Sequence, residues 1–506
     1  MLVRPPHILI PPDAEDPDFA GQRGVGASDA SGNARDYHAH EAHTRGIQGS
    51  AKGSRPRASR KTGAVRLRLR RQQTCPRNPS KSAVKCSTVR FGLPALRGPV
   101  HMDAIASRNL RPPLGPATRF VNPATFPEPG RTAVVNALAR ARTNLAEAFK
   151  GISVDGREPS PGLFPIFKTG VSTKPIVDAA NAFASLLTPT QRSTVSFPID
   201  SDQWRSWQNM HCFLLRHGLL LDELSHEQRQ AALDILRASF SVSGFENARD
   251  IMRLNEHAAE LTGRHDEFGE WLYWISLFGE PSRAEPWGWQ IDGHHLIVNC
   301  FILGDQLVMT PDFRGSEPVL AKSGKYAGTE VFRDEEAFGL ELMRALSPKQ
   351  REKAIIGTNV PRDVITTAQV DNLEMPVMGI CYDALTPPQR VLMRKLIAVY
   401  VGRIRPGHEE IRMAEVIKHL SHTHFGWIGG WDQDSAFYYR IYSPVILVEF
   451  DHLPGIIWDN MEPTRDHIHT VVRTPNGNDY GRDLLRQHYA QHDHTNPHSP
   501  HRRKLG

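Results

Sequence analysis

The chain has 506 residues, with 61 Lys or Arg against 55 Asp or Glu, and a formal net charge of +6. No run of about 18 apolar residues occurs, which excludes an ordinary transmembrane helix, so we expect a soluble protein without a membrane partner. The five cysteines are widely spaced and include no Cys-x-x-Cys pair, which argues against a disulfide framework and a cysteine-zinc site.

Positive charge is concentrated in the first 130 residues. They hold 21 Lys or Arg against 9 Asp or Glu, a net of +12, which leaves 40 against 46, a net of −6, for the remainder. Because this stretch has little hydrophobic periodicity and many Pro, Gly and Ser residues, we expect residues 1–130 to form a disordered basic tail. The run Arg66–Arg71 could bind nucleic acid, but a solvated tail explains it as well, and we expect no nucleic-acid partner. The first residues lack the apolar core of a secretory signal, so the compartment stays unassigned.

A helical pattern begins at Arg131, and no long low-complexity break follows until about residue 493. We therefore expect a single large α+β domain over residues 131–493, with helices first and mainly antiparallel β-structure later. Residues 494–506 are rich in His, Pro and Arg and are expected to form a second disordered tail. The sequence does not indicate an oligomeric state.

A short motif, Leu-Ser/Thr-x-x-Gln-Arg, occurs four times and predicts four helix starts. The hydroxyl residue suits the N-cap, and Gln three residues later can reach back to the cap. The caps within each pair are 37 and 39 residues apart, which indicates a duplicated helical layout. The four predicted caps are Thr188, Ser225, Ser347 and Thr386.

Other segments are assigned by their hydrophobic period. We expect helices at 228–239, 247–261, 268–278 and 482–489, and strands at 289–301, 302–309, 437–450 and 467–473. The first two strands would meet at a Gly304-Asp305 hairpin turn. The segment beginning Trp289-Gln290-Ile291 resembles the one beginning Tyr439-Arg440-Ile441. Aligning the two segments matches Asn299 with Glu449 and predicts a duplicated half-sheet.

The strongest indication of a site is His467-Ile468-His469. Alternate side chains of a strand share a face, so both imidazoles could bind one metal ion. His294 and His295 lie in the earlier strand and would face opposite ways, so that only one of them could join the site while the other packs or is exposed. His422 and His424 form a second alternate pair, which we rank below the first because Gly and Trp surround it.

Several further residues are candidates for the same pocket. Glu449 ends an apolar run, and burying its carboxylate without a partner would cost several kcal/mol, so a cation, a histidine or a metal should neutralise it. A structural salt bridge to an arginine is the alternative. Asp479, which could also cap the last helix, and His488 are the other catalytic candidates, and the predicted substrate-binding residues are Trp289, Arg440 and Arg473.

Four segments in this order resemble a known family: EPWGWQIDGHHL (285–296), FGWIG (425–429), YYRIYSPVILVEFD (438–451) and HIHTVVRTPNGNDYG (467–481), the last followed by DLLRQHY. The family is domain of unknown function 3500, and the resemblance spans about residues 131–492. It implies no activity, and although its members often look exported, no clear leader precedes this domain.

These features together predict a metal-dependent enzyme that acts on a small, anionic molecule. Two imidazoles and one carboxylate suit either zinc hydrolysis or a non-haem iron centre, and we favour the hydrolase over the oxidoreductase. The alternative is a non-catalytic module that binds a small molecule without turning it over. Nucleotide-cofactor and serine-hydrolase motifs are absent from the chain.

Overall fold

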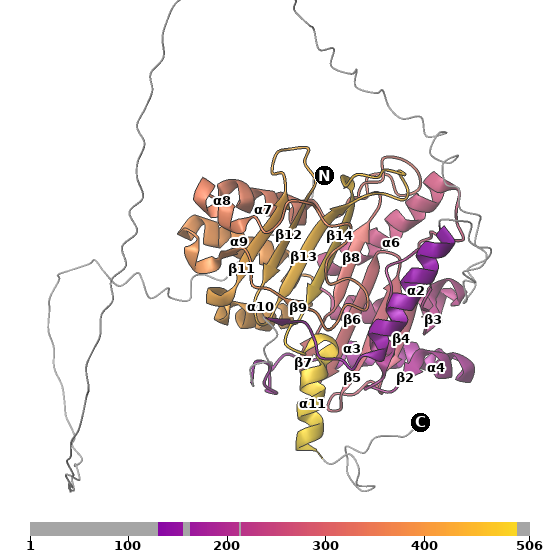
Figure 1. Cartoon of the computed structure of the whole chain (residues 1–506). Coiled ribbons are helices and arrows are strands. Elements are labelled where there is room, and N and C mark those ends of the chain that lie inside the picture. The colour runs from indigo at the N-terminus through magenta and orange to yellow at the C-terminus, as the bar shows by residue number, and fades with distance from the viewer. Residues whose placement is uncertain (1–129, 155–161, 212–213, 493–506) are drawn as a thin grey trace, which may run out of the picture. The chain divides into compact units, whose positions relative to one another are not determined.

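A twelve-stranded, mainly antiparallel sheet forms the centre of the part described by this computed structural model, residues 130–154, 162–211 and 214–492 (Figure 1). Strands β14 (Thr464–Arg473) and β8 (Asp312–Ser316) pair antiparallel in the middle. Outward from β14 follow β13 (Leu447–Leu453), β12 (Phe437–Tyr442), β11 (His424–Gly429) and β10 (Ile380–Cys381). Outward from β8 follow β6 (Leu296–Leu303), β5 (Trp287–Gly293), β4 (Tyr273–Phe278) and β2 (Ser196–Phe197), while β3 (Leu219–Leu220) also pairs with β4 and β7 (Gln306–Val308) with β6. A separate parallel pair joins β1 (Ser153–Val154) to β9 (Glu374–Met375).

The two halves of the sheet repeat one layout, as the sequence predicts. Gln290 pairs with Asn299 across β5 and β6, and Arg440 pairs with Glu449 across β12 and β13. The helices that begin at the four caps repeat in the same way: α4 (Pro189–Val195) and α5 (His226–Ser239) in one half, α8 (Pro348–Ala354) and α9 (Pro387–Val401) in the other. All four have capping boxes, which confirms the predicted starts. Within each half the two capping glutamines also bond each other, Gln191 with Gln228 and Gln350 with Gln389.

Helices cover one face of the sheet, called here the helix-covered face. They pack on side chains such as Ile468 and Val472 of β14 and form the largest hydrophobic core. Burying such apolar surface stabilises the fold by about 25 cal/mol per Å². The helices of this layer include α3 (Lys174–Ser185), α5, α6 (Val242–Thr262), α7 (Arg333–Ala345), α9, α10 (His408–Lys418) and α11 (Arg482–Gln491).

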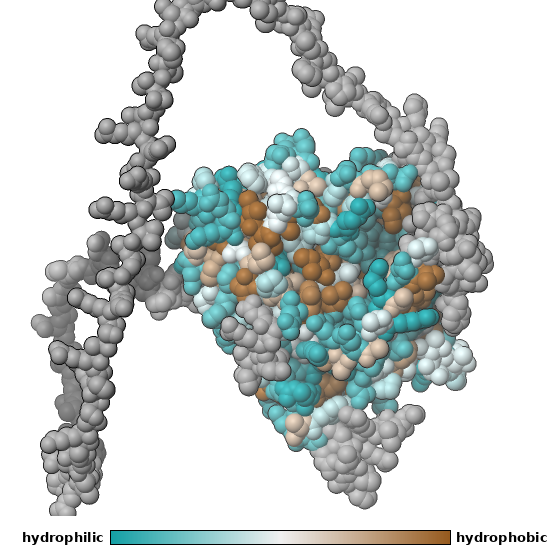
Figure 2. Space-filling model, viewed as in Figure 1, coloured by the Kyte–Doolittle hydropathy of each residue, from teal (hydrophilic) through white to brown (hydrophobic). Residues whose placement is uncertain are grey.

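Irregular segments cover the opposite face, called here the loop-covered face. Trp204 and Trp207 come from one segment and Val364 from another, and they pack on Phe313 of β8 and Val471 of β14. Helix α2 (Gly130–Ala146) crosses in front of this face in Figure 1. Hydrophobic residues on the surface seen in Figure 2 form small patches separated by hydrophilic ones. The loop-covered face is therefore closed mainly by segments without regular secondary structure.

Three predicted elements differ from the structure. The strand expected over 437–450 is two strands, β12 and β13, joined by residues 443–446. Residues 273–278, expected in a helix, form strand β4, because a short, largely apolar run fits a buried strand as well as a buried helix. The strand expected over 289–301 is two strands, β5 and β6, joined by a two-residue turn at His294 and His295. The hairpin at Gly304-Asp305 is confirmed between β6 and β7.

The predicted tails, residues 1–130 and 494–506, lie outside the described residues except for Gly130, where α2 begins. Among the helices that the structure describes, none has the length and apolar character needed to span a bilayer.

Candidate metal centre

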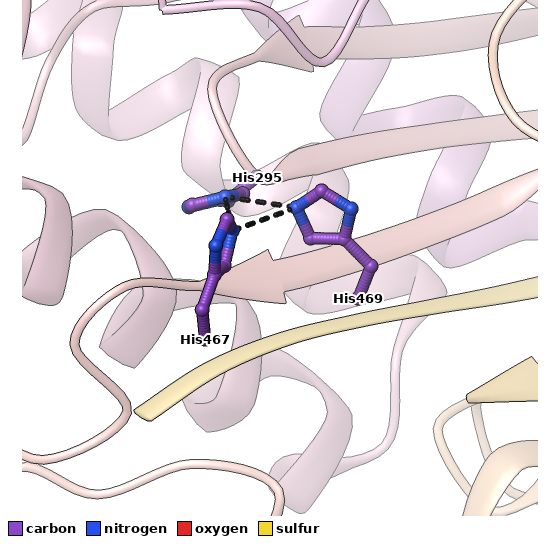
Figure 3. A group of neighbouring side chains, drawn as sticks. All are labelled: His295, His467 and His469. Carbon is purple, nitrogen blue, oxygen red and sulfur yellow. Dashed lines mark hydrogen bonds between the residues drawn. The ribbon is translucent and has the colours of Figure 1, made fainter. Parts of the chain in front are cut away.

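Three imidazoles meet on the loop-covered face (Figure 3). Their Nε2 atoms are 3.0 Å apart between His467 and His469, 3.1 Å between His295 and His469, and 3.3 Å between His295 and His467. All three side chains are buried, with 4–5% of each residue exposed. Ligands about 2.0–2.1 Å from a tetrahedral zinc ion lie about 3.3–3.4 Å from one another, so the triad is close to that spacing.

Strand β14 supplies two of the rings. Because side chains alternate, His467 and His469 both project from the loop-covered face, as the sequence predicts. Gly315 of β8 pairs with His469, and a Cβ at this position would lie 2.7 Å from Cδ2 of His469 and 2.9 Å from Cδ2 of His295. The central strand therefore needs glycine here for the rings to meet.

The third ring comes from the β5–β6 turn and not from a strand. His295 has φ 67°, a left-handed conformation that is uncommon outside glycine, and this turn directs its ring to the triad. The His294 ring stacks on the His295 ring at 3.8 Å, and its Nδ1 lies 2.9 Å from Oδ1 of Asn255. The predicted alternation between opposite strand faces is wrong for this pair, because neither residue is in a strand. His294 lies outside the triad, and burial lowers its pKa to about 3.

Hydrogen bonds on the outer ring nitrogens decide which nitrogens carry protons. Nδ1 of His467 lies 2.8 Å from the carbonyl oxygen of Pro454, and Nδ1 of His469 lies 2.8 Å from Oδ1 of Asp363. These oxygens only accept, so each Nδ1 donates, and each neutral ring then has a lone pair on Nε2. Burial, and next the neighbouring imidazoles, hold the pKa of His295 and of His467 well below the usual range, which keeps both neutral.

Two lone pairs therefore face each other at 3.0 Å between His467 and His469. His295 has one proton to donate and can satisfy only one of the two acceptors. His295 can donate to Nε2 of His467, and the NH2 group of Asn209, at 3.3 Å, can donate to Nε2 of His469. A cation at the centre would take the place of these hydrogen bonds and bind the three Nε2 atoms, including the two lone pairs that face each other.

A second carboxylate, Glu317, lies beside His467. One oxygen is 3.6 Å from Nδ1 of His467, and the carboxylate accepts from three backbone amides at 2.8, 2.8 and 3.1 Å. Those amides belong to Ile456, Ile457 and Trp458. Burial raises the pKa of Glu317 to about 7 in spite of these donors. Glu317 thus holds the segment that carries Pro454 against the triad.

Asn209 lies at the triad on a segment after the 3-10 helix Asp202–Arg205. Its Oδ1 accepts from the backbone N–H of His295 at 3.0 Å, and its Nδ2 is 3.3 Å from Nε2 of His469. The side chain is only partly buried. Asn209 thus places the NH2 group of its side chain next to Nε2 of His469, a candidate metal ligand.

Arg473, the predicted substrate clamp, is fully buried and holds the segment of Asp363 in place. It donates to Asp371 at 2.9 Å, to Asp479 at 3.2 Å and to the carbonyl oxygens of Thr366 and nearby residues. Four residues further along β14 than His469, it starts about 13 Å from the triad. Arg473 therefore does not reach the triad. Buried carboxylates of the protein itself neutralise its charge, so it is not available to bind a substrate anion.

Asp479 and Glu449, the predicted acid and third ligand, are each bound by other groups of the protein, away from the triad. Asp479 accepts from the backbone N–H of Thr474 at 2.7 Å and from Arg473, and it does not cap α11, whose N-cap is Gly481. Glu449 is buried as predicted, but its partners are the amides of residues 365 and 366, at 2.8 and 2.9 Å, the Thr366 hydroxyl and the Tyr438 hydroxyl. Neither belongs to the histidine group.

The remaining predicted site residues lie elsewhere. Trp289 is fully buried and donates from Nε1 to Ser239, within the helix-covered core. Arg440 donates to the carbonyl oxygen of Pro376, and His488 lies on α11, 3.6 Å from Glu285. The rival pair His422 and His424 joins no group of three possible ligands among the described residues.

A cavity of about 470 Å³ lies between α10, β7 and residues 162–169. Its walls include Met309, Arg412 and Val472, and none of the three triad histidines. Val472 belongs to the helix-covered face, so this cavity is not part of the candidate metal centre.

Sequence reasoning did not find Asp363, Glu317, Gly315 or Asn209. Asp363 and Asn209 lie on irregular segments, where no period indicates the direction of a side chain. Glu317 and Gly315 are in or next to β8, which was not predicted. Gly315 could have been found only by recognising β8 as the strand that pairs with the His-x-His strand.

Comparison with known proteins gives a family and no activity. No curated protein and no solved structure matches the chain. A family model described as protein of unknown function (DUF3500) matches residues 169–482, which include all three histidines of the triad. The matched region is more than half of the chain, and the protein therefore belongs to the DUF3500 family.

Proposed function

We propose that the protein is a metal-dependent hydrolase in which His295, His467 and His469 bind one divalent cation. The observation that carries this proposal is the approach of three Nε2 atoms to 3.0–3.3 Å, two of them fixed as acceptors by their Nδ1 partners. Neutral imidazoles are the form that binds metal, and the low pKa of His295 and of His467 keeps them ready at neutral pH.

The outer partners support the same proposal. Histidine ligands of metals almost always donate their other ring N–H to a carboxylate or a backbone carbonyl, which fixes the tautomer and raises the basicity of the ligand. His469 has the carboxylate of Asp363, and His467 has the carbonyl of Pro454. Such partners are what a metal centre requires of its surroundings.

The ligand set favours zinc and hydrolysis over iron and oxidation. Three protein ligands with an open fourth position are typical of catalytic zinc, which lowers the pKa of bound water to about 7. Non-haem iron oxygenases use two histidines and one carboxylate. Among the described residues, the group that could hold an ion consists of imidazoles alone.

The proposed substrate is a small molecule, but the predicted arginine clamps no longer support a negative charge on it. Arg473 is buried against Asp371 and Asp479, and Arg440 bonds Pro376. The proposal therefore keeps the metal ion and the hydrolytic reaction but no longer includes a negatively charged substrate.

Elemental analysis and titration with Zn²⁺ test the proposal. We expect purified wild type to bind one tightly held ion per chain, and the double variant His467→Ala/His469→Ala to lose it. The matched control is His422→Ala/His424→Ala, which removes an alternate pair of the same spacing outside the triad. It also leaves the histidine-rich C-terminus intact, so weak binding there is the same in all samples.

Equal zinc in wild type and in the His467/His469 variant would contradict the proposal. A wild type that binds zinc at the triad but hydrolyses none of a panel of ester, amide and phosphate substrates would instead support a non-catalytic binding module.

A further inference from the structure

Asn209 is held in one orientation at the triad. Its backbone neighbours are anchored: the N–H of Gln208 donates to Oδ1 of Asp292 at 3.1 Å, and the carbonyl oxygen of Trp207 accepts from Gln369. Both anchoring residues are buried. These two hydrogen bonds fix the backbone next to Asn209, so the fold sets the position of Asn209 beside the triad.

The direction of the amide is also determined. A backbone N–H can only donate, so the atom of Asn209 that contacts the N–H of His295 at 3.0 Å is the oxygen. The NH2 group must then point toward Nε2 of His469, at 3.3 Å. A donor that faces the triad cannot be a metal ligand, since the two N–H groups have no lone pair to offer.

From these contacts we propose that Asn209 is a substrate-binding residue, and that its NH2 group donates to an oxygen atom bound at the open coordination position. This inference rests on the metal-dependent function proposed above. It names the substrate class as molecules that present a carbonyl or phosphoryl oxygen, in which negative charge grows during hydrolysis. Asparagine donors of this kind stabilise such an oxygen without a change in their own charge.

The same contact has a consequence for metal binding. The lone pair of His469 that would accept from Asn209 is the one that a metal needs, so the ion and the amide compete for it. With an ion bound, the NH2 group of Asn209 would lose this acceptor and would be free to donate to an oxygen ligand of the ion. Removing the amide should thus weaken the binding of an oxygen ligand without weakening the binding of metal.

Cobalt-loaded full-length protein provides the test, because the visible spectrum of Co²⁺ responds to its fourth ligand. Acetate and inorganic phosphate are titrated separately into wild type, Asn209→Ala and Asn209→Asp, and cobalt affinity is measured by competition with a chelator. The control is Gln203→Ala, which removes an exposed amide from the same segment.

We expect Asn209→Ala to bind cobalt at least as tightly as wild type and to bind the anion about tenfold more weakly, as for the loss of one hydrogen bond to a charged group. Asn209→Asp should weaken the anion further through repulsion. Tighter binding of acetate to wild type would indicate a carboxylic acid derivative as substrate, and tighter binding of phosphate would indicate a phosphoric acid derivative.

Unchanged anion affinity in Asn209→Ala would overturn the inference while the metal centre stands. A parallel loss of cobalt affinity in this variant would also overturn it, because it would make Asn209 a structural support of the triad. A wild type that gives no cobalt spectrum would overturn the proposed function itself, and this inference with it.

Discussion

Asp363 accepts a hydrogen bond of 2.8 Å from Nδ1 of His469, a residue 106 positions further along the chain. The bond ties an irregular segment to the central strand of the sheet. It also sets the tautomer of His469, because the ring that donates from Nδ1 keeps a lone pair on Nε2.

We expect Asp363→Asn to weaken zinc binding about 10- to 100-fold, the usual effect of removing a partner of a histidine ligand. The side chain of Asp363 is 37% exposed, so the fold should tolerate the change, and the midpoint of urea unfolding should stay close to that of wild type. The control is Asp383→Asn, an exposed aspartate on the 3-10 helix Tyr382–Ala384. Zinc affinity equal to that of wild type would show that the Asp363 bond has no part in the centre.

Gly315→Ala should disturb the triad from the neighbouring strand. Its Cβ would lie 2.7 and 2.9 Å from ring carbons of His469 and His295, and 2.8 Å from a backbone oxygen. We expect weaker zinc binding together with a loss of stability of about 1–3 kcal/mol, as for other overpacked sites. The control is Gly304→Ala, in the turn between β6 and β7, where open space surrounds the added Cβ, although its positive φ brings some strain. Zinc titration and urea unfolding of both variants measure the two effects, and a Gly315→Ala variant that binds zinc normally would contradict the assignment.

Arg473→Met should destabilise the protein strongly. The substitution leaves Asp371 and Asp479 buried without their common partner, and breaking a buried ion pair in this way costs about 3–5 kcal/mol. The matched change at an exposed arginine, Arg486→Met, should alter stability by less than about 0.5 kcal/mol. Urea unfolding measures both, and equal midpoints for the two variants would refute the structural role given to Arg473.

Asp292 predicts a pH dependence of stability. Burial raises its pKa in the folded protein to about 8, whereas an unfolded chain has an aspartate pKa of roughly 3.9. Between these values the unfolded state has lost a proton that the folded state keeps, so wild type loses stability as pH rises from about 4 to about 8. Asp292→Asn removes this contribution and can still accept from Gln208.

The difference in unfolding free energy between Asp292→Asn and wild type should therefore grow with pH and level off above pH 8. One pKa unit corresponds to about 1.4 kcal/mol, so a gain of a few kcal/mol in favour of the variant is expected at pH 9. Urea unfolding at pH 5, 7 and 9 measures the difference. A constant offset across this range would mean that the carboxyl group of Asp292 does not titrate as described.

How much of this site the sequence could predict depends on where each residue lies. His467 and His469 were found because a strand has a strict period of two, and the helix starts because capping boxes are local. The sequence narrowed the third ligand only to His294 or His295. Side chains project differently from a turn and from a strand, and the turn at these two residues was not recognised. Glu449 was expected to meet a cation, a histidine or a metal, but amides and hydroxyls bind it instead. Arg473 was expected to bind substrate, but it pairs with buried carboxylates of the protein. Several of these partners lie on an irregular segment that no local pattern places.

X-ray absorption at the zinc edge of the metal-loaded protein tests the central claim most directly. Three imidazole nitrogens at about 2.0–2.1 Å, with one further light ligand, are expected in wild type. Two imidazoles or fewer should remain in His295→Ala, since that variant deletes the ligand supplied by the β5–β6 turn. A wild-type shell dominated by oxygen, or a shell that His295→Ala leaves unchanged, would contradict a metal centre formed by His295, His467 and His469.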